Sequence, residues 1–140
     1  MRWLPYALLC SVFLANADFF VKLASNRISS SMGMLVYGAT TFTVGTIWVS
    51  YLKLTKQPLL ITQQGLLYSL AVGLAFSGVT ILLYVTFARV NVSIGSPTIR
   101  VMGILITSLL GILILHEPFT WRYLLGLIMT IAGVALIIFR

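Results

Sequence analysis

Charged side chains are scarce in this sequence, and acidic ones are almost absent. Only 8% of the 140 residues are charged and only two are acidic, whereas 60% are hydrophobic and the mean hydropathy is +1.09. A soluble domain needs a polar, charged surface, and this chain has too little charge to make one. The composition therefore excludes an ordinary soluble domain and indicates a membrane protein.

Cysteine and histidine occur once each, as Cys10 and His116. A single cysteine excludes an intrachain disulfide, and one histidine beside Glu117 provides no cluster of metal ligands. We expect Cys10 to be a small buried hydrophobe within an apolar run. We expect His116 and Glu117 to form a polar turn without a metal or hydrolytic site. This argues against an enzyme, and no cofactor is expected.

The basic residues give a formal net charge of +7 but do not form a stripe. They lie one or two at a time between long apolar runs, which is typical of loop ends at a lipid surface. This distribution argues against nucleic acid as a partner and favours membrane lipid.

The first apolar run has two interpretations. Arg2 followed by apolar residues up to the small residues at 15–17 resembles a cleavable signal peptide. Hydrophobicity continues through residues 19–21, however, and a basic flank follows at Lys22 and Arg27, as in a spanning helix. We favour a retained first helix, with cleavage as the alternative.

Long apolar windows separated by polar residues follow one another along the chain. A helix needs about 20 mostly apolar residues to cross a bilayer. The windows that meet this requirement are residues 3–24, 32–54, 65–88, 92–115 and 121–139. Lipid cannot satisfy open backbone groups, and these runs are too long and too uniformly apolar for barrel strands. The sequence predicts an all-α integral membrane protein, with residues 1–140 as a single transmembrane domain of five helices.

The basic residues at or beyond the ends of the windows are balanced between the two sides of the membrane. With five crossings, the N-terminal side carries Arg2, Lys53, Lys56 and Arg122, and the opposite side carries Lys22, Arg27, Arg89 and Arg140. The positive-inside rule therefore gives almost no preferred orientation. Two interpretations stay open: dual topology with antiparallel pairing of copies, or an orientation set by a partner or a longer-range signal.

Two ionisable residues, Asp18 and Arg100, lie several residues from the ends of the predicted spans, at depths where lipid is expected. Charges there are costly and face a protein interior or a wet cavity. From their distances to the helix ends on one side of the membrane, both Cα atoms lie roughly 6 to 12 Å deep, which permits an ion pair. In one interpretation the pair is structural, or Arg100 snorkels to the headgroups. In the other, Arg100 binds an anionic or zwitterionic group, and Asp18 competes with it or carries a proton.

Two further residues are candidates for the same substrate site. Lys22 lies one turn from Asp18, nearer the interface, and either anchors the helix end or contributes to the site. Tyr84 either lines a cavity or anchors the protein at the membrane interface.

Small residues and a proline mark the last two helices. Ser96 and Pro97 interrupt the fourth helix, where Pro97 removes a backbone hydrogen bond. Together with Arg100 they make this helix the leading candidate for the substrate path, with Ser96 in contact with substrate. Gly126 and Gly133 are seven residues apart, so they share one face of the fifth helix and permit close helix packing.

Motifs in the last and first helices are similar to those of a known family. Residues 92–138 contain Val-Ser-Ile-Gly-Ser, then Leu-His-Glu-Pro, then Gly-Leu-Ile-Met-Thr-Ile-Ala-Gly-Val. This stretch resembles the end of an EamA-type unit of the drug/metabolite transporter superfamily. The first helix, with Asn-Ala-Asp-Phe-Phe-Val-Lys at residues 16–22, resembles the first helix of that unit, which commonly closes with a lysine. The similarity covers most of the chain.

The resemblance implies a dimer. Larger members of the superfamily carry two inverted units, so one unit implies an antiparallel homodimer that rebuilds a ten-helix inverted repeat. Gly126 and Gly133 match the glycine spacing on the dimer-forming helix of the related small multidrug resistance proteins. Those proteins bind drug and protons at a glutamate in the first helix. At the matching position this chain has Leu14, and its Asp18 lies one turn deeper along the helix. This departure argues against cationic-drug antiport, and Arg100 favours an anionic or zwitterionic substrate.

The expected function is secondary transport of a small metabolite by alternating access, in the plasma (inner) membrane of a prokaryote. The last two helices also resemble small subunits proposed to flip lipid-linked aminosugars, where His-Glu-Pro occurs in the same turn. This implies a flippase, or a flippase subunit, as the alternative. A membrane assembly subunit that transports nothing is the third hypothesis.

Overall fold

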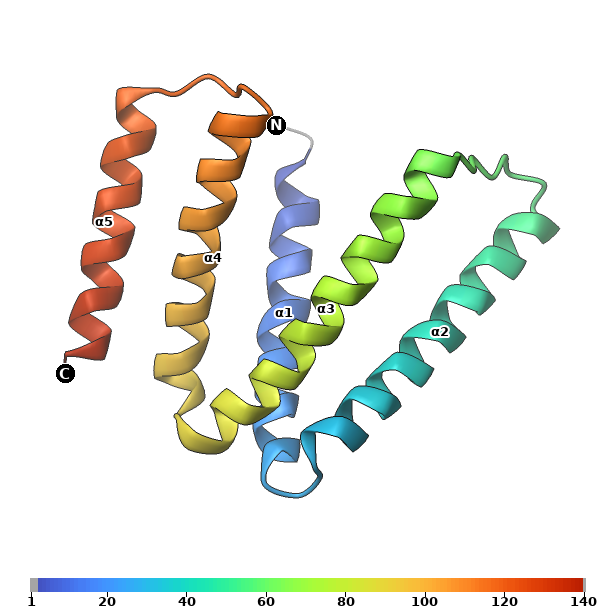
Figure 1. Ribbon diagram of the computed structural model, residues 1–140, viewed down its shortest axis with the longest axis horizontal. Coiled ribbons are helices and arrows are strands. Elements are labelled where there is room, and N and C mark those ends of the chain that lie inside the picture. Colours follow the sequence, from blue (N-terminus) through green and yellow to red (C-terminus); the bar gives the residue numbers. More distant parts are fainter. Residues whose placement is uncertain (1–2, 140) are drawn as a thin grey trace. The chain divides into compact units, whose positions relative to one another are not determined.

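The computed structural model describes residues 3–139, which form five helices in two compact units (Figure 1). The first unit, residues 1–89, contains α1 (Leu4–Ser25), α2 (Ser30–Leu54) and α3 (Gln63–Arg89). The second unit, residues 90–140, contains α4 (Val92–Ile114) and α5 (Trp121–Ile138). Each helix is long and apolar enough to cross a membrane, so the all-α prediction with five such helices is confirmed.

The helix ends lie within two residues of those expected from the sequence. Arg2 and Arg140, which entered the charge count, lie outside the described residues. The assignment of the whole chain to a single transmembrane domain stays a prediction.

Hydrogen bonds and left-handed residues terminate several of the helices. Ser29 and Thr120 cap α2 and α5 by accepting hydrogen bonds from backbone N–H groups three residues further on. After α2 and α4, Lys56 and His116 adopt positive φ angles of 54° and 52°. A left-handed residue at this position lets the following N–H groups turn back onto the last carbonyls of the helix.

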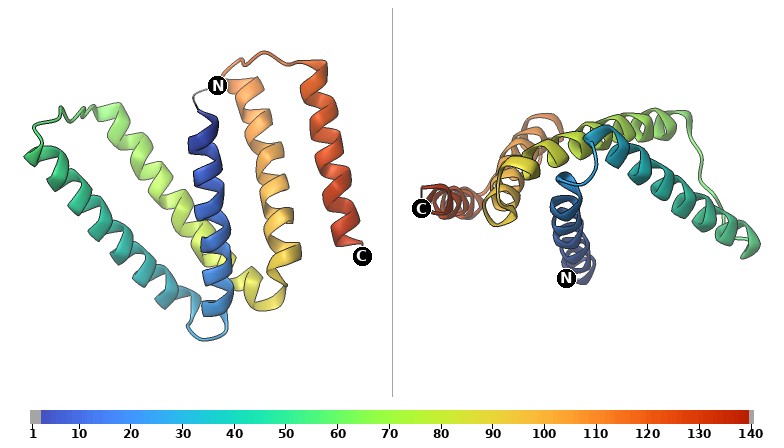
Figure 2. Two further views of the ribbon diagram at one scale, coloured as in Figure 1. Left: turned by 180° about the vertical axis from the view of Figure 1, so that it is seen from behind. Right: turned by 90° about the horizontal axis from the view of Figure 1, so that it is seen from below.

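In the first unit, α3 packs against both α1 and α2, whereas α1 and α2 have less contact with each other (Figures 1 and 2). The chain reverses direction between α1 and α2 and again between α2 and α3. In the second unit, α4 and α5 form an antiparallel hairpin. Candidate site residues therefore lie on α1 and α3 in one unit and on α4 in the other.

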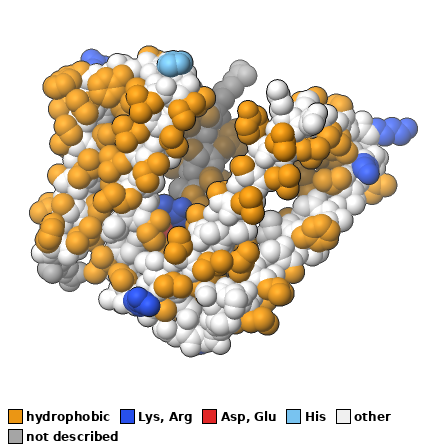
Figure 3. Space-filling view, viewed as in Figure 1, with side chains coloured by type: hydrophobic (Ala, Val, Ile, Leu, Met, Phe, Trp, Pro, Cys, Tyr) orange, Lys and Arg blue, Asp and Glu red, His pale blue; other side chains and the backbone are white. Residues whose placement is uncertain are grey.

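Large apolar side chains cover much of the surface (Figure 3). Phe87 is fully buried and Val101 and Val134 are nearly so, but most other large apolar side chains are exposed. A soluble monomer rarely exposes so large an apolar surface. Lipid tails are as apolar as leucine, so in a membrane this surface needs no protein cover.

Cys10 is exposed on α1, so the expectation that it is buried is wrong. An apolar side chain on a membrane helix is solvated by lipid and has no need to pack inside the chain. Hydrophobicity therefore does not predict burial here as it does in a soluble protein.

Candidate functional site

Asp18 is the buried acidic residue of α1, with 2% of its surface exposed. Among the described residues of α1, it is the one that is buried. The pattern is the reverse of a soluble helix, because the apolar residues face outward and the carboxyl group faces inward. A buried charge of this kind is stable only with polar groups around it. Asp18 therefore has polar partners inside the protein.

Lys22 follows Asp18 by one turn and connects α1 to α3. Its Nζ donates a hydrogen bond of 2.5 Å to the backbone carbonyl of Phe87, in the last turn of α3. The last carbonyls of a helix have no partner within it, and the partial negative charge there favours a cation. This contact gives Lys22 a structural role, and its contact with substrate stays a prediction.

Lys22→Met is expected to lower the stability of the protein by about 1.5 kcal/mol, because the Phe87 carbonyl loses a charge-assisted hydrogen bond. Lys56→Met is the matched control, since Lys56 is exposed in the turn after α2. Thermal unfolding of the two purified variants in detergent measures the difference. Equal unfolding midpoints for the two variants would contradict the capping role.

Tyr84 of α3 lies directly over Gly33 in the first turn of α2. A Cβ atom at Gly33 would lie 2.5 Å from Cζ and 2.8 Å from the hydroxyl oxygen of Tyr84, too close for any side chain. Gly33 is buried and Tyr84 is half-buried. The missing side chain at Gly33 thus lets α2 and α3 approach each other, a contact that the sequence analysis did not identify. Contact between Tyr84 and a substrate stays a prediction.

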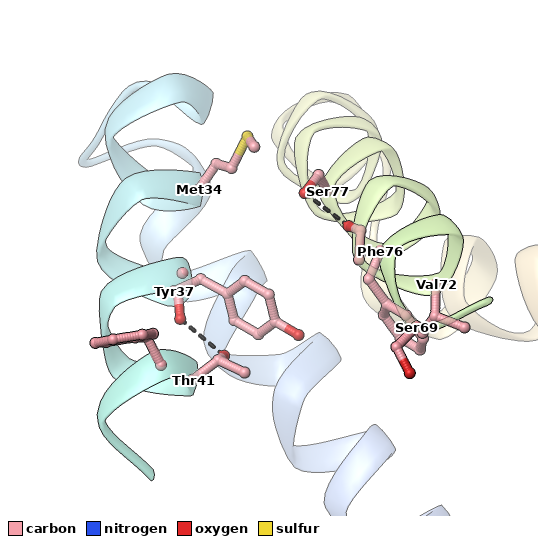
Figure 4. A pocket seen from close by; sticks show the side chains of 10 residues that line it. Met34, Tyr37, Thr41, Ser69, Val72, Phe76 and Ser77 are labelled. Carbon is pink, nitrogen blue, oxygen red and sulfur yellow. Dashed lines mark hydrogen bonds between the residues drawn. The ribbon is translucent and has the colours of Figure 1, made fainter. Parts of the chain in front are cut away.

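A groove of about 380 Å³ lies between α2 and α3 (Figure 4). The ring of Tyr37 extends from α2 toward α3, and Thr41, Ser69 and Ser77 add hydroxyl groups to the lining. Thr41 Oγ1 donates to the Tyr37 carbonyl and Ser77 Oγ to the Gly73 carbonyl, each at 2.8 Å. The hydroxyl hydrogens of Thr41 and Ser77 therefore bond to carbonyls of their own helices. Toward the groove, these two hydroxyl groups can only accept hydrogen bonds.

Ser96 and Arg100 lie on one face of α4, because residues four apart in a helix are neighbours. Both side chains are half-buried. Pro97 lies between them within the helix and has no N–H, so the Ser93 carbonyl loses its regular helical partner. The second unit thus presents a cation, a hydroxyl and a loosened turn together, and their binding of substrate stays a prediction.

Gly126 and Gly133 are exposed on α5. A Cβ atom at either position would meet nothing within 4 Å. Within the described chain, no side chain of another helix closes over this pair. The face is thus open to close approach by a further helix, although a dimer stays a prediction.

Taken together, the helices, their apolar surface and the buried Asp18 define a multi-pass membrane protein with a carboxyl group in its interior. Among residues 3–139, no group of three or more His, Cys, Asp or Glu residues could hold a metal ion. The model of the EamA-like transporter family matches residues 1–139, and the chain belongs to this family. Neither the curated proteins nor the solved structures compared with the chain give a match.

Membership of this family confirms the identification made from the motifs of the first and last helices. Members of the family are membrane transporters of small substrates. The functional class is therefore transport.

Proposed function

We propose that this chain is a secondary transporter that carries a small anionic or zwitterionic metabolite by alternating access. The observation that supports this most strongly is the burial of Asp18, which has 2% of its surface exposed within an apolar helix. An ionisable residue is costly at this depth, and in membrane proteins it marks a substrate or ion pathway. We place the transporter in the plasma membrane of a prokaryote.

Arg100 holds the anionic group of the substrate in this proposal, and Asp18 is its counter-charge when the transporter is empty. A guanidinium group offers five N–H donors and binds a carboxylate or phosphate through two parallel hydrogen bonds. Ser96, on the same face of α4, supplies a hydroxyl group next to this cation. Lys22 and Tyr84 complete the proposed set from the first unit.

The working unit in this proposal is an antiparallel homodimer that rebuilds a ten-helix inverted repeat. Two observations support it: the basic residues on the two sides are balanced, and Gly126 and Gly133 form an exposed face on α5. Small residues let membrane helices approach closely, so this face suits contact between the α5 helices of two copies.

Accessibility tags at the two termini test the dimer. We expect each tag to be reached from both sides of the membrane in comparable amounts, because the chain has no charge bias to orient it. Gly133→Leu is expected to reduce cross-linking between copies, whereas Gly103→Leu, at an open position on α4, is the control. A single fixed orientation of all copies would rule out the antiparallel homodimer.

Reconstitution of the purified chain alone in proteoliposomes tests the function. We expect uptake of at least one labelled carboxylate, phosphate ester or zwitterion from a metabolite panel, and none of a quaternary ammonium dye. Uptake of the dye alone would contradict the assigned substrate charge. Absence of any uptake, together with a need for a second membrane chain for stability, would indicate an assembly subunit instead.

A second candidate is a flippase, or a flippase subunit, for a lipid-linked sugar. The groove between α2 and α3 favours it, because none of the residues that line the groove is charged and several carry hydroxyl groups or aromatic rings. Hydroxyl acceptors beside aromatic faces suit an uncharged sugar ring. Copurification of a polyprenyl-phosphate lipid, or thermal protection by one, would favour this candidate over metabolite transport.

A further inference from the structure

The turn between α4 and α5 brings the exposed side chain of Glu117 against α4. His116 has a φ angle of 52°, and the Glu117 N–H then donates back to the Gly111 carbonyl at 3.2 Å. The Glu117 side chain lies against α4, where a Cβ atom at Gly111 would be 2.9 Å from Oε2 and 3.3 Å from Cδ. The glycine at position 111 therefore makes room for the carboxylate.

A cavity of about 250 Å³ lies beside this carboxylate, within the second unit. It is lined by Ser108, Ile112, Glu117, Pro118 and Tyr123. Ser108 Oγ donates to the Ile104 carbonyl at 2.6 Å, so the hydrogen bond between the Ser108 and Tyr123 hydroxyls uses the hydrogen of the tyrosine. Both hydroxyl oxygens keep lone pairs. The polar side chains of this cavity therefore accept hydrogen bonds and do not donate them into it.

The negative charge of Glu117 is not neutralised within the described chain. No Lys, Arg or His of residues 3–139 forms an ion pair with it, and the nearest of these in sequence, His116 and Arg122, are exposed, as Glu117 is. The C-terminal end of α4 carries a partial negative charge of its own, which disfavours a carboxylate nearby. The cavity thus combines acceptors and negative charge with two apolar walls.

We propose that this cavity binds a primary ammonium group at Glu117. The three N–H donors of an ammonium match the carboxylate and the two hydroxyl oxygens, and Ile112 and Pro118 contact the adjoining methylene groups. The cavity is too small for a drug-sized ligand, for which 300 Å³ is about the lower limit. An ethanolamine-sized group fits this volume.

This site is distinct from the proposed substrate path at Arg100. Gly111 lies eleven positions after Arg100 in α4, which corresponds to about 16 Å along the helix. A small zwitterion cannot bridge that distance, so the ammonium belongs to a second ligand. The cavity lies at the ends of α4 and α5, near the exposed Trp121, a residue type common at the membrane interface. The amine of an aminophospholipid headgroup or a dissolved amine can reach it there.

Thermal unfolding of the full chain in detergent, with added phosphatidylethanolamine or phosphatidylcholine of identical acyl chains, tests the site. Both headgroups carry a cation and a phosphate, but the choline nitrogen has no N–H. We expect the apparent affinity for phosphatidylethanolamine to be about tenfold higher. Equal stabilisation by the two lipids, or no stabilisation by either lipid or by ethanolamine, overturns the proposal. Ethanolamine in the aqueous phase distinguishes the sources: stabilisation by it assigns a dissolved amine, and stabilisation by the lipid alone assigns a headgroup.

Substitutions on α4 and in the turn link the effect to Glu117. Glu117→Gln removes the charge at constant size, and Gly111→Ala keeps the charge but displaces the carboxylate. We expect both variants to bind the two lipids about equally. Gly103→Ala adds the same methyl group to α4 where nothing lies within 4 Å, and it keeps the preference. A tenfold preference retained in Glu117→Gln overturns the proposal. If Gly111→Ala does not fold, Tyr123→Phe takes its place as the second variant. We expect it to weaken the preference for phosphatidylethanolamine about threefold.

Discussion

Arg100→Ala is expected to reduce uptake by the reconstituted protein at least about 100-fold. Removing one partner of a buried charge-assisted pair costs about 2 to 5 kcal/mol, and 100-fold corresponds to about 2.7 kcal/mol. Arg100→Lys keeps the charge but cannot form two parallel hydrogen bonds, so it retains part of the activity. Arg27→Ala removes an exposed cation between α1 and α2 and leaves uptake unchanged. Initial rates of uptake in proteoliposomes measure all three.

Asp18→Asn tests the second charged residue of the proposed site. Asparagine has nearly the shape of aspartate, so it removes the charge without opening a cavity in the buried position. We expect uptake to fall about tenfold, since in the proposed site Asp18 is the counter-charge of Arg100 when the transporter is empty. A monodisperse elution profile and an unchanged unfolding midpoint separate this effect from misfolding. Normal transport by both Asp18→Asn and Arg100→Ala would show that the site is assigned wrongly.

The extents of the helices could be predicted from the sequence, because each depends on a local property. About 20 apolar residues bounded by polar ones are enough to define a membrane-spanning helix. The burial of Asp18 could also be predicted, because a carboxyl group within such a run is costly in contact with lipid. Its burial in the structure agrees with this argument.

Contacts between distant segments could not be predicted. The acceptor for Lys22 is the backbone carbonyl of Phe87. Every residue has a backbone carbonyl, so the sequence does not indicate which one accepts this hydrogen bond. Exposure was also misjudged, as for Cys10, because lipid and protein interior are equally apolar and hydrophobicity cannot distinguish them. At Glu117 the sequence indicated a polar turn, but it gave no sign that the side chain lies against Gly111.

The contact between Gly33 and Tyr84 is another such case, and it leads to the second large effect. Gly33→Ala is expected to destabilise the protein by about 2 to 3 kcal/mol, because the new methyl group overlaps the tyrosine ring. The tyrosine side chain has a rigid ring and two torsions, so it can avoid the overlap with the methyl group only by leaving its packed position. Gly38→Ala, on the same helix where nothing lies within 4 Å, is the control and is expected to be neutral or slightly stabilising.

A double-mutant cycle isolates this contact from other effects of the substitution. In a Tyr84→Ala background the overlapping ring is absent, so Gly33→Ala should then cost no more than Gly38→Ala. The expected coupling energy between positions 33 and 84 is about 2 kcal/mol, obtained from unfolding midpoints of the four proteins in one detergent. Equal destabilisation by Gly33→Ala in both backgrounds would mean that the ring does not limit the approach of α2 to α3. In that case the spacing between these two helices would depend on other contacts, and the groove between them would not depend on Gly33.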